Sequence, residues 1–173
     1  TMVRQTVKAV FNFDSVGLMK IAQEMNEEIL TDNPFSYGGA INQGRRNLSV
    51  EIERVKKKMA AGAEFFLTQP VFCEEDVQRL RQVKEETGAC ILCGIMPLIS
   101  RKNALFMKNE ISGVNIPDEV IARYPENGGR EAGETVGVSI ARDIIRLTED
   151  FVDGYYFSFP FNRTYLLRQI MTD

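Results

Sequence analysis

The fold is decided by the stretch Gly62-Ala63-Glu64-Phe65-Phe66-Leu67-Thr68-Gln69-Pro70-Val71-Phe72. A charged helical run ends at Gly62, and strand-forming residues follow at 64–68. The strand ends in a polar Thr-Gln pair, and Pro70, which cannot donate a hydrogen bond to a sheet, is expected to close it. Apolar strands that end in fixed polar groups form the sites of many α/β enzymes. The same pair could also be two solvated residues at a strand end.

The rest of the chain alternates between helical and extended patterns in the same way. Its predicted strands cover 36–42, 64–68, 89–95 and 155–159. Its predicted helices cover 14–29, 47–62, 74–87, a turn or more around 104–107, 117–124, 129–149 and a closing segment after Arg163. Nearly continuous apolar strands are typical of a parallel sheet covered on both faces.

Two architectures fit this alternation: an open doubly wound sheet, and part of a (β/α)8 barrel. The sequence has no GxGxxG fingerprint and no phosphate-binding P-loop. The absence of these motifs weakens the nucleotide-binding version of the doubly wound sheet.

Composition excludes several classes of function. The chain has 173 residues, of which 44% are hydrophobic and 26% are charged, as expected for one soluble domain with its own core. A net charge of −3 argues against a nucleic-acid-binding or anionic-membrane-binding surface. No apolar run approaches the ~20 residues that span a bilayer, and no signal peptide opens the sequence, so we expect a cytoplasmic protein.

The sequence contains no histidine, which removes Ser-His and Cys-His catalysis and histidine-zinc sites from this chain. Cys90 and Cys93 have the spacing of a redox pair, but they lie in a predicted buried strand, where apolar thiols are expected. Cys73 completes an odd set of three. Any chemistry must therefore use carboxylates, lysine, arginine, tyrosine, amides or a bound cofactor.

Polar or aromatic groups follow each predicted strand. They are Asn42 with Gln43, Thr68 with Gln69, the turn at 96–98, and the segment 159–163. In a barrel these loops all lie on one face, where the active sites of barrel enzymes are built.

Three kinds of group at these strand ends suit a ligand. Gln69 could hydrogen-bond the edge of a flat heterocycle, and Arg163 could hold a carboxylate through its fork. Phe159 and Phe161 could stack on an aromatic ligand. The alternatives are loop capping for Gln69 and Asn42, a surface charge for Arg163, and core packing for the two phenylalanines.

Four segments together resemble methylenetetrahydrofolate reductases. Segment 62–72 resembles a family signature in which glycine-alanine-x-phenylalanine is followed by threonine-glutamine. Gly94-Ile95-Met96-Pro97-Leu98 resembles the next strand end, 154–163 the last strand and substrate loop, and 13–18 an upstream segment. The sequence is most similar to the reductase modules of bacterial bifunctional proteins that also carry a homocysteine methyltransferase.

The resemblance implies the C-terminal half of a (β/α)8 barrel, with about four parallel strands, and residues 1–173 forming a single partial domain. It implies a reaction in which NAD(P)H reduces FAD, and FAD then reduces 5,10-methylenetetrahydrofolate to 5-methyltetrahydrofolate. The implied contacts to folate or nicotinamide are Gln69, Asn103, Met107, Phe159, Phe161 and Arg163. The implied contacts to FAD are Asn42, Glu51, Arg54, Lys57, Lys58 and Leu67.

The sequence departs from the family pattern at several of these places. Gln43 stands where family members often carry proline, and Cys73 stands where an acid is common. Met107 replaces an aromatic residue of some members, and Glu51 is one methylene longer than the aspartate of some relatives. These differences bear on individual contacts.

The resemblance places the catalytic glutamate of the family, and an aspartate beside the flavin, in the N-terminal half of the barrel. We therefore expect this chain alone not to catalyse the full reaction, and to pair with the other half or with a second copy. One alternative is a non-catalytic α/β interaction module with the same fold. Another is a phosphate-binding barrel isomerase or lyase, for which a glycine-rich loop would be expected in place of 160–163.

Overall fold

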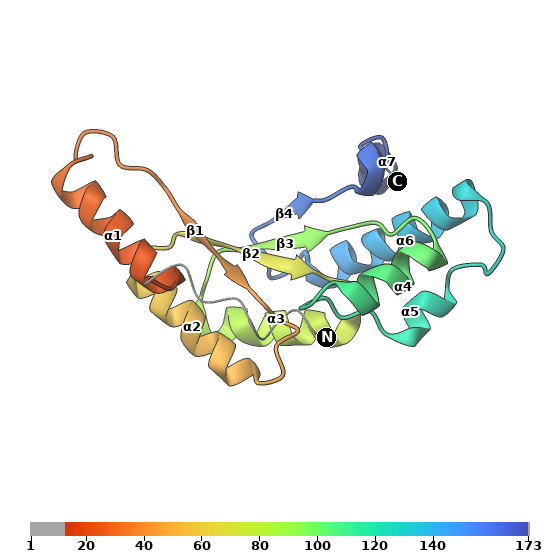
Figure 1. The fold of residues 1–173 in the computed structure, drawn as a ribbon, viewed down its shortest axis with the longest axis horizontal. Coiled ribbons are helices and arrows are strands. Elements are labelled where there is room, and N and C mark those ends of the chain that lie inside the picture. The colour runs from red at the N-terminus through yellow and green to blue at the C-terminus, as the bar shows by residue number, and fades with distance from the viewer. Residues whose placement is uncertain (1–12, 173) are drawn as a thin grey trace, which may run out of the picture.

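A computed structural model describes residues 13–172, which form an α/β structure of four parallel strands alternating with helices (Figure 1). The strands are β1 (Gly38–Ile41), β2 (Phe65–Pro70), β3 (Ile91–Ile95) and β4 (Gly154–Phe157). The helices are α1 (Ser15–Glu28), α2 (Leu48–Ala60), α3 (Glu74–Thr87), α4 (Arg101–Glu110), α5 (Asp118–Ala122), α6 (Arg130–Thr148) and α7 (Leu166–Met171), with a 3-10 turn at Pro160–Asn162. No helix within 13–172 has the length and apolar character needed to cross a membrane.

The four strands lie in the sheet in the same order as in the sequence, and all neighbouring pairs are parallel. Helices α2, α3 and α6 form one continuous layer on a single face of the sheet, and α2 contacts α3, which contacts α6 (Figure 1). The expectation that helices cover both faces is therefore wrong for the part of the chain described here. Sequential strand order with helices on one side is the arrangement of a partial (β/α)8 barrel, so the barrel alternative is the correct one.

The core lies between the sheet and this layer of helices. Alternate strand residues point into it, and among them Ile41, Phe66 and Ile91 are almost completely buried. The next residue of β2, Leu67, points to the opposite face of the sheet and is 38% exposed. Burial of each large apolar side chain stabilises the fold by roughly 2 kcal/mol. Most of this stabilisation comes from the face of the sheet that packs against the helices.

Most helix boundaries follow the predicted signals. The Asp14 carboxylate accepts a 2.8 Å hydrogen bond from the Gly17 N–H at the start of α1, and Gly88 ends α3 in the left-handed conformation with φ of +65°. Helix α2 ends at Ala60, slightly before the predicted Gly62. Gly62 instead has φ of +86° and lies against the Tyr37 hydroxyl, so this position requires glycine for both conformation and space.

Strand β2 ends at Pro70, as predicted, but it extends past the predicted 64–68 through a β-bulge. Leu67 pairs with Leu92 and Pro70 pairs with Gly94, so β2 has one more residue than β3 over this interval. The Thr68 hydroxyl accepts the Gly94 N–H at 2.9 Å, and the Val71 N–H donates to the Gly94 carbonyl at 3.1 Å. The missing N–H of proline is tolerated there because these two bonds replace a regular ladder.

Candidate functional site

The candidate site is the edge of the sheet at which all four parallel strands end. Asn42 and Gln43 follow β1, Thr68 and Gln69 lie in the bulge of β2, and Arg163 comes after β4. Because the strands are parallel, these groups share one edge, as predicted. They form two separate clusters, one after β1 and β2 and one after β4.

Gln43 and Gln69 are joined by a two-way hydrogen bond in the first cluster. The Gln69 N–H donates to Gln43 Oε1 at 3.1 Å, and Gln43 Nε2 donates to the Gln69 carbonyl at 2.9 Å. Gln43 is completely buried, whereas Gln69 is only half-buried. Within residues 13–172 the side-chain amide of Gln69 makes no hydrogen bond, so it is available to a ligand.

Glu51 fixes the loop after β1. Its buried carboxylate accepts the Asn42 N–H at 3.0 Å and forms a 3.0 Å ion pair with Arg45 Nε. Asn42 Oδ1 is buried and has no hydrogen-bond partner among residues 13–172. An unsatisfied buried acceptor of this kind is costly unless a bound group donates to it.

The remaining residues assigned to FAD lie on α2 and β2. Lys58 is buried and its ammonium donates to the Ala40 carbonyl at 2.6 Å, while Arg54, Lys57 and Leu67 are exposed. Burial lowers the pKa of Lys58, and the nearby Glu51 carboxylate opposes this shift. Lys58 also lines a cavity of about 630 Å³ between α1 and β1.

A buried carboxylate, Asp76, lies behind the first cluster. Burial raises the pKa of Asp76 to about 6, although hydrogen bonds from Asn115 and Gln43 oppose the shift. Its Oδ2 atom has no hydrogen-bond partner among residues 13–172. On the next turn of α3, Arg79 donates to the Gln43 carbonyl at 2.5 Å and also to the Arg45 carbonyl.

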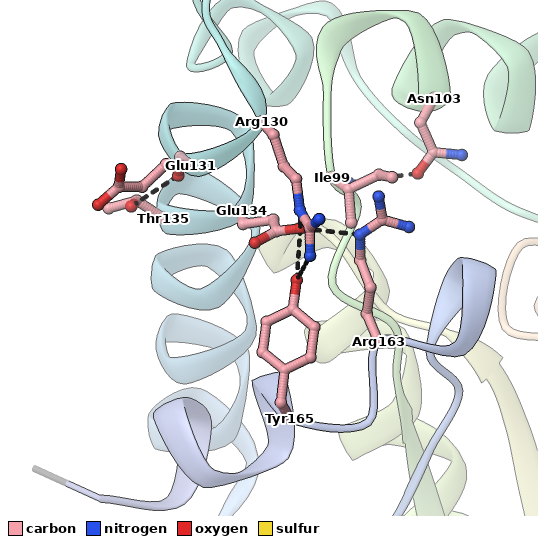
Figure 2. A network of polar contacts seen from close by, with 8 residues as sticks. All are labelled: Ile99, Asn103, Arg130, Glu131, Glu134, Thr135, Arg163 and Tyr165. Atoms are coloured by element: carbon pink, nitrogen blue, oxygen red, sulfur yellow. Dashed lines mark hydrogen bonds and ion pairs between the residues drawn. The ribbon is translucent and has the colours of Figure 1, made fainter.

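The second cluster is centred on Glu134 of α6 (Figure 2). Its Oε1 atom accepts hydrogen bonds from Arg163 Nε at 2.8 Å, Tyr165 at 2.7 Å and Arg130 Nε at 2.9 Å. Burial opposes ionisation of Glu134, but these three donors outweigh it and lower the pKa of this carboxyl. Figure 2 shows that the terminal nitrogens of Arg163 point away from Glu134, so only Nε of this guanidinium bonds that carboxylate.

The other residues assigned to the substrate, Asn103, Met107, Phe159 and Phe161, differ in their exposure. Asn103 Oδ1 accepts the Ile99 N–H at 3.3 Å, and Met107 is partly buried against the core. The Phe159 ring stacks on Phe157 at 6.0 Å between centroids. Phe161 is 74% exposed with φ of +55°, and its ring lies under the Arg163 guanidinium.

Three polar groups at or behind this edge were not predicted from the sequence: Gln43 as the partner of Gln69, Asp76, and Glu134. The burial of Glu134 could have been predicted, because it lies between Gly133 and Gly137 on the side of α6 that packs inward. The sequence places Gln43 among the polar residues after the first strand, but it gives no sign that Gln43 pairs with Gln69. Cys93 is a buried thiol, as predicted, and burial raises its pKa to about 12.

The fold defines a partial (β/α)8 barrel with polar side chains at the carboxyl ends of its strands. The sequence profile described as methylenetetrahydrofolate reductase matches residues 35–172. The chain belongs to the methylenetetrahydrofolate reductase family, as the resemblance implied.

One solved structure supports the same fold. It is described as an uncharacterized protein from Clostridium thermocellum that binds two copies of 5-methyl-5,6,7,8-tetrahydrofolic acid. The TM-score is 0.61 at 18% sequence identity, over 90% of this chain and 56% of that chain. The present chain thus spans little more than half the length of that protein. Comparison with curated protein sequences finds no match.

Proposed function

We propose that this chain is the folate-binding half of a flavin-dependent methylenetetrahydrofolate reductase, which reduces 5,10-methylenetetrahydrofolate to 5-methyltetrahydrofolate with NAD(P)H. The observation that carries the proposal is the Gln69 side-chain amide. It lies at the carboxyl end of a barrel strand, on a fixed backbone, with no internal hydrogen bond within residues 13–172. Family membership and a structural neighbour that binds 5-methyltetrahydrofolic acid support the same ligand class.

Each cluster suits one part of a folate. The Gln69 amide offers one acceptor and two donors, which match the hydrogen-bonding edge of a pterin ring. The free side of the Arg163 fork suits a carboxylate, and Phe159 and Phe161 offer aromatic surface beside it. Asn103 and Met107 would complete the wall of this site on α4.

The residues assigned to FAD fit an anionic cofactor in charge and in hydrogen-bonding capacity. Glu51, Arg54 and Lys58 are spaced so that they share one face of α2, and Lys57 adjoins them. Arg45 pairs with Glu51, so Arg54, Lys57 and Lys58 supply the excess positive charge. The buried, unpaired Asn42 Oδ1 could accept a hydrogen bond from the cofactor. When bound, FAD would accept a hydride and pass it on, while Leu67 would offer apolar surface.

A flavin titration tests this proposal. FAD fluorescence should be quenched on binding, with 5-methyltetrahydrofolate then perturbing the absorption spectrum of the bound flavin. Lys58→Met should weaken FAD binding by roughly tenfold, because a charged hydrogen bond to phosphate contributes about 1.5 kcal/mol.

Lys56→Met is the matched control, since Lys56 lies on the same helix but is exposed and paired with Glu53. This control should bind FAD as the wild type does. Absence of flavin binding, even with the N-terminal half of the barrel supplied in trans, would overturn the proposal and favour a non-catalytic interaction module.

A further inference from the structure

The bulge in β2 creates a structural requirement at Gln69. A bulged residue lies outside the regular ladder, so its backbone N–H and C=O lose their partners on the neighbouring strand. Both groups of Gln69 are satisfied without β3. The N–H donates to Gln43 Oε1, and the carbonyl accepts from Gln43 Nε2 and from the Thr68 hydroxyl at 2.8 Å.

Gln43 is itself held rigidly. Its side chain is completely buried, and Nε2 also lies 3.5 Å from the Pro70 carbonyl. Its own carbonyl accepts the Arg79 Nε hydrogen bond from α3. The contacts therefore run in one chain from α3 through the main chain of Gln43 to the backbone of Gln69. A side chain with this many fixed contacts has little rotamer freedom left to lose.

We propose that Gln43 is a positioning residue for the ligand, acting only through Gln69. Gln43 fixes the peptide on both sides of the Gln69 α-carbon, so the Gln69 amide is directed into the site before any ligand arrives. Pre-organisation of this kind improves affinity because the ordering cost is met during folding. The inference rests on the proposed function, in that the ligand is taken to be a folate.

A double-mutant cycle tests this inference. Gln43→Met preserves side-chain length but removes both hydrogen bonds, and Gln69→Ala removes the side chain that the bonds direct. Each single substitution should weaken binding of 5-methyltetrahydrofolate to the whole chain by roughly tenfold, measured by calorimetric titration. Because Gln43 acts through Gln69, adding Gln43→Met to Gln69→Ala should cost no further affinity.

A matched control distinguishes positioning from general stability. Asn26 binds the Phe35 backbone in the same two-way manner, at 2.9 and 3.1 Å, far along the chain from the site. Asn26→Leu should expose the Phe35 amide to hydrogen exchange and leave folate affinity unchanged. Gln43→Met should instead expose the Gln69 amide while the core amides of β3 remain protected.

Two results would overturn the inference: unchanged folate affinity in Gln43→Met, or a further tenfold loss when this change is added to Gln69→Ala. If the wild type fails to bind the folate, the proposed function fails. In that case the exchange of the Gln69 amide still decides whether Gln43 holds the peptide.

Discussion

The two clusters at the carboxyl edge of the sheet hold Gln69 and Arg163 by different physical means. After β1 and β2, the neutral, fully buried Gln43 holds the backbone of Gln69. After β4, the charged Glu134 holds the side chain of Arg163 within a network that is partly open to solvent. The first cluster fixes a peptide, and the second fixes a guanidinium.

This difference predicts different responses to perturbation. Neutral hydrogen bonds in a buried site depend little on pH or salt, whereas ion pairs near the surface depend on both. The cluster after β4 should therefore respond to changes in packing of α6 and in the charge of Glu134. The hydrogen bonds between Gln43 and Gln69 should change little with pH, and the pH dependence of stability on this side should come from Asp76 behind them.

The largest effect is expected from Gly137→Ala on α6. A Cβ at this position would lie 2.0 Å from the Leu98 carbonyl oxygen, so α6 would have to move away from the turn after β3. We expect the free energy of unfolding to fall by about 3 kcal/mol in urea denaturation, a typical cost of overpacking. Amide exchange should increase around Glu134 and Arg163 and stay unchanged at Gln69.

Gly129→Ala is the matched control for this change. Gly129 precedes the same helix, and a Cβ there would meet no atom within 4 Å. Gly129→Ala should lower the free energy of unfolding by less than about 1 kcal/mol. Equal destabilisation by both substitutions would show that close approach of α6 to Leu98 is not what stabilises this region.

A smaller effect is expected from Asp76→Asn, and it should depend on pH. The pKa of Asp76 is raised from 3.8 to about 6, so the folded state binds the proton more tightly than the unfolded state. Wild-type stability should therefore fall as pH rises from 4 to 6 and then level off. The neutral variant should be more stable than wild type by roughly 2 kcal/mol at pH 8, an advantage that disappears near pH 4.

Glu74→Gln controls for the helix dipole, because Glu74 is exposed in the same first turn of α3. Thermal unfolding of both variants at pH 4, 6 and 8 measures the difference. If Asp76→Asn and Glu74→Gln had the same pH profile, the buried position of Asp76 would not be the cause.

The smallest effect is expected from Glu134→Gln. The lowered pKa of Glu134 means that its contribution to stability is present at pH values above 4.5 and is lost as pH falls through the folded-state pKa. The variant should lose about 1 kcal/mol at pH 7 and should show a weaker loss of stability on acidification from pH 5 to pH 3.

Glu131→Gln is its control, since Glu131 is exposed one turn earlier and points away from Arg163 (Figure 2). In urea denaturation, Glu131→Gln should have the same free energy of unfolding as the wild type at pH 7, pH 5 and pH 3. An identical acid profile for Glu134→Gln and wild type would show that the network after β4 does not depend on that charge.

The sequence was sufficient to predict the strands, most helix ends and the common edge of the site, because each rests on local patterns. Apolar runs define β2 and β3, and Asp14 and Gly88 bound their helices through interactions with adjacent residues. The bulge at Thr68–Gln69 could not be predicted, because it depends on the register with Gly94 on another strand. The roles of Gln43 and Glu134 depend likewise on partners 26 and 29 residues away along the chain.

The central claim is that the carboxyl edge of this sheet binds a folate through Gln69 and Arg163. The most direct measurement is a titration of the isotope-labelled chain with 5-methyltetrahydrofolate, followed by two-dimensional NMR of backbone amides and side chains. The claim predicts saturable shifts at Gln69, Asn103 and Arg163. Saturable shifts confined to residues away from this edge, or no shifts at millimolar ligand, would contradict it.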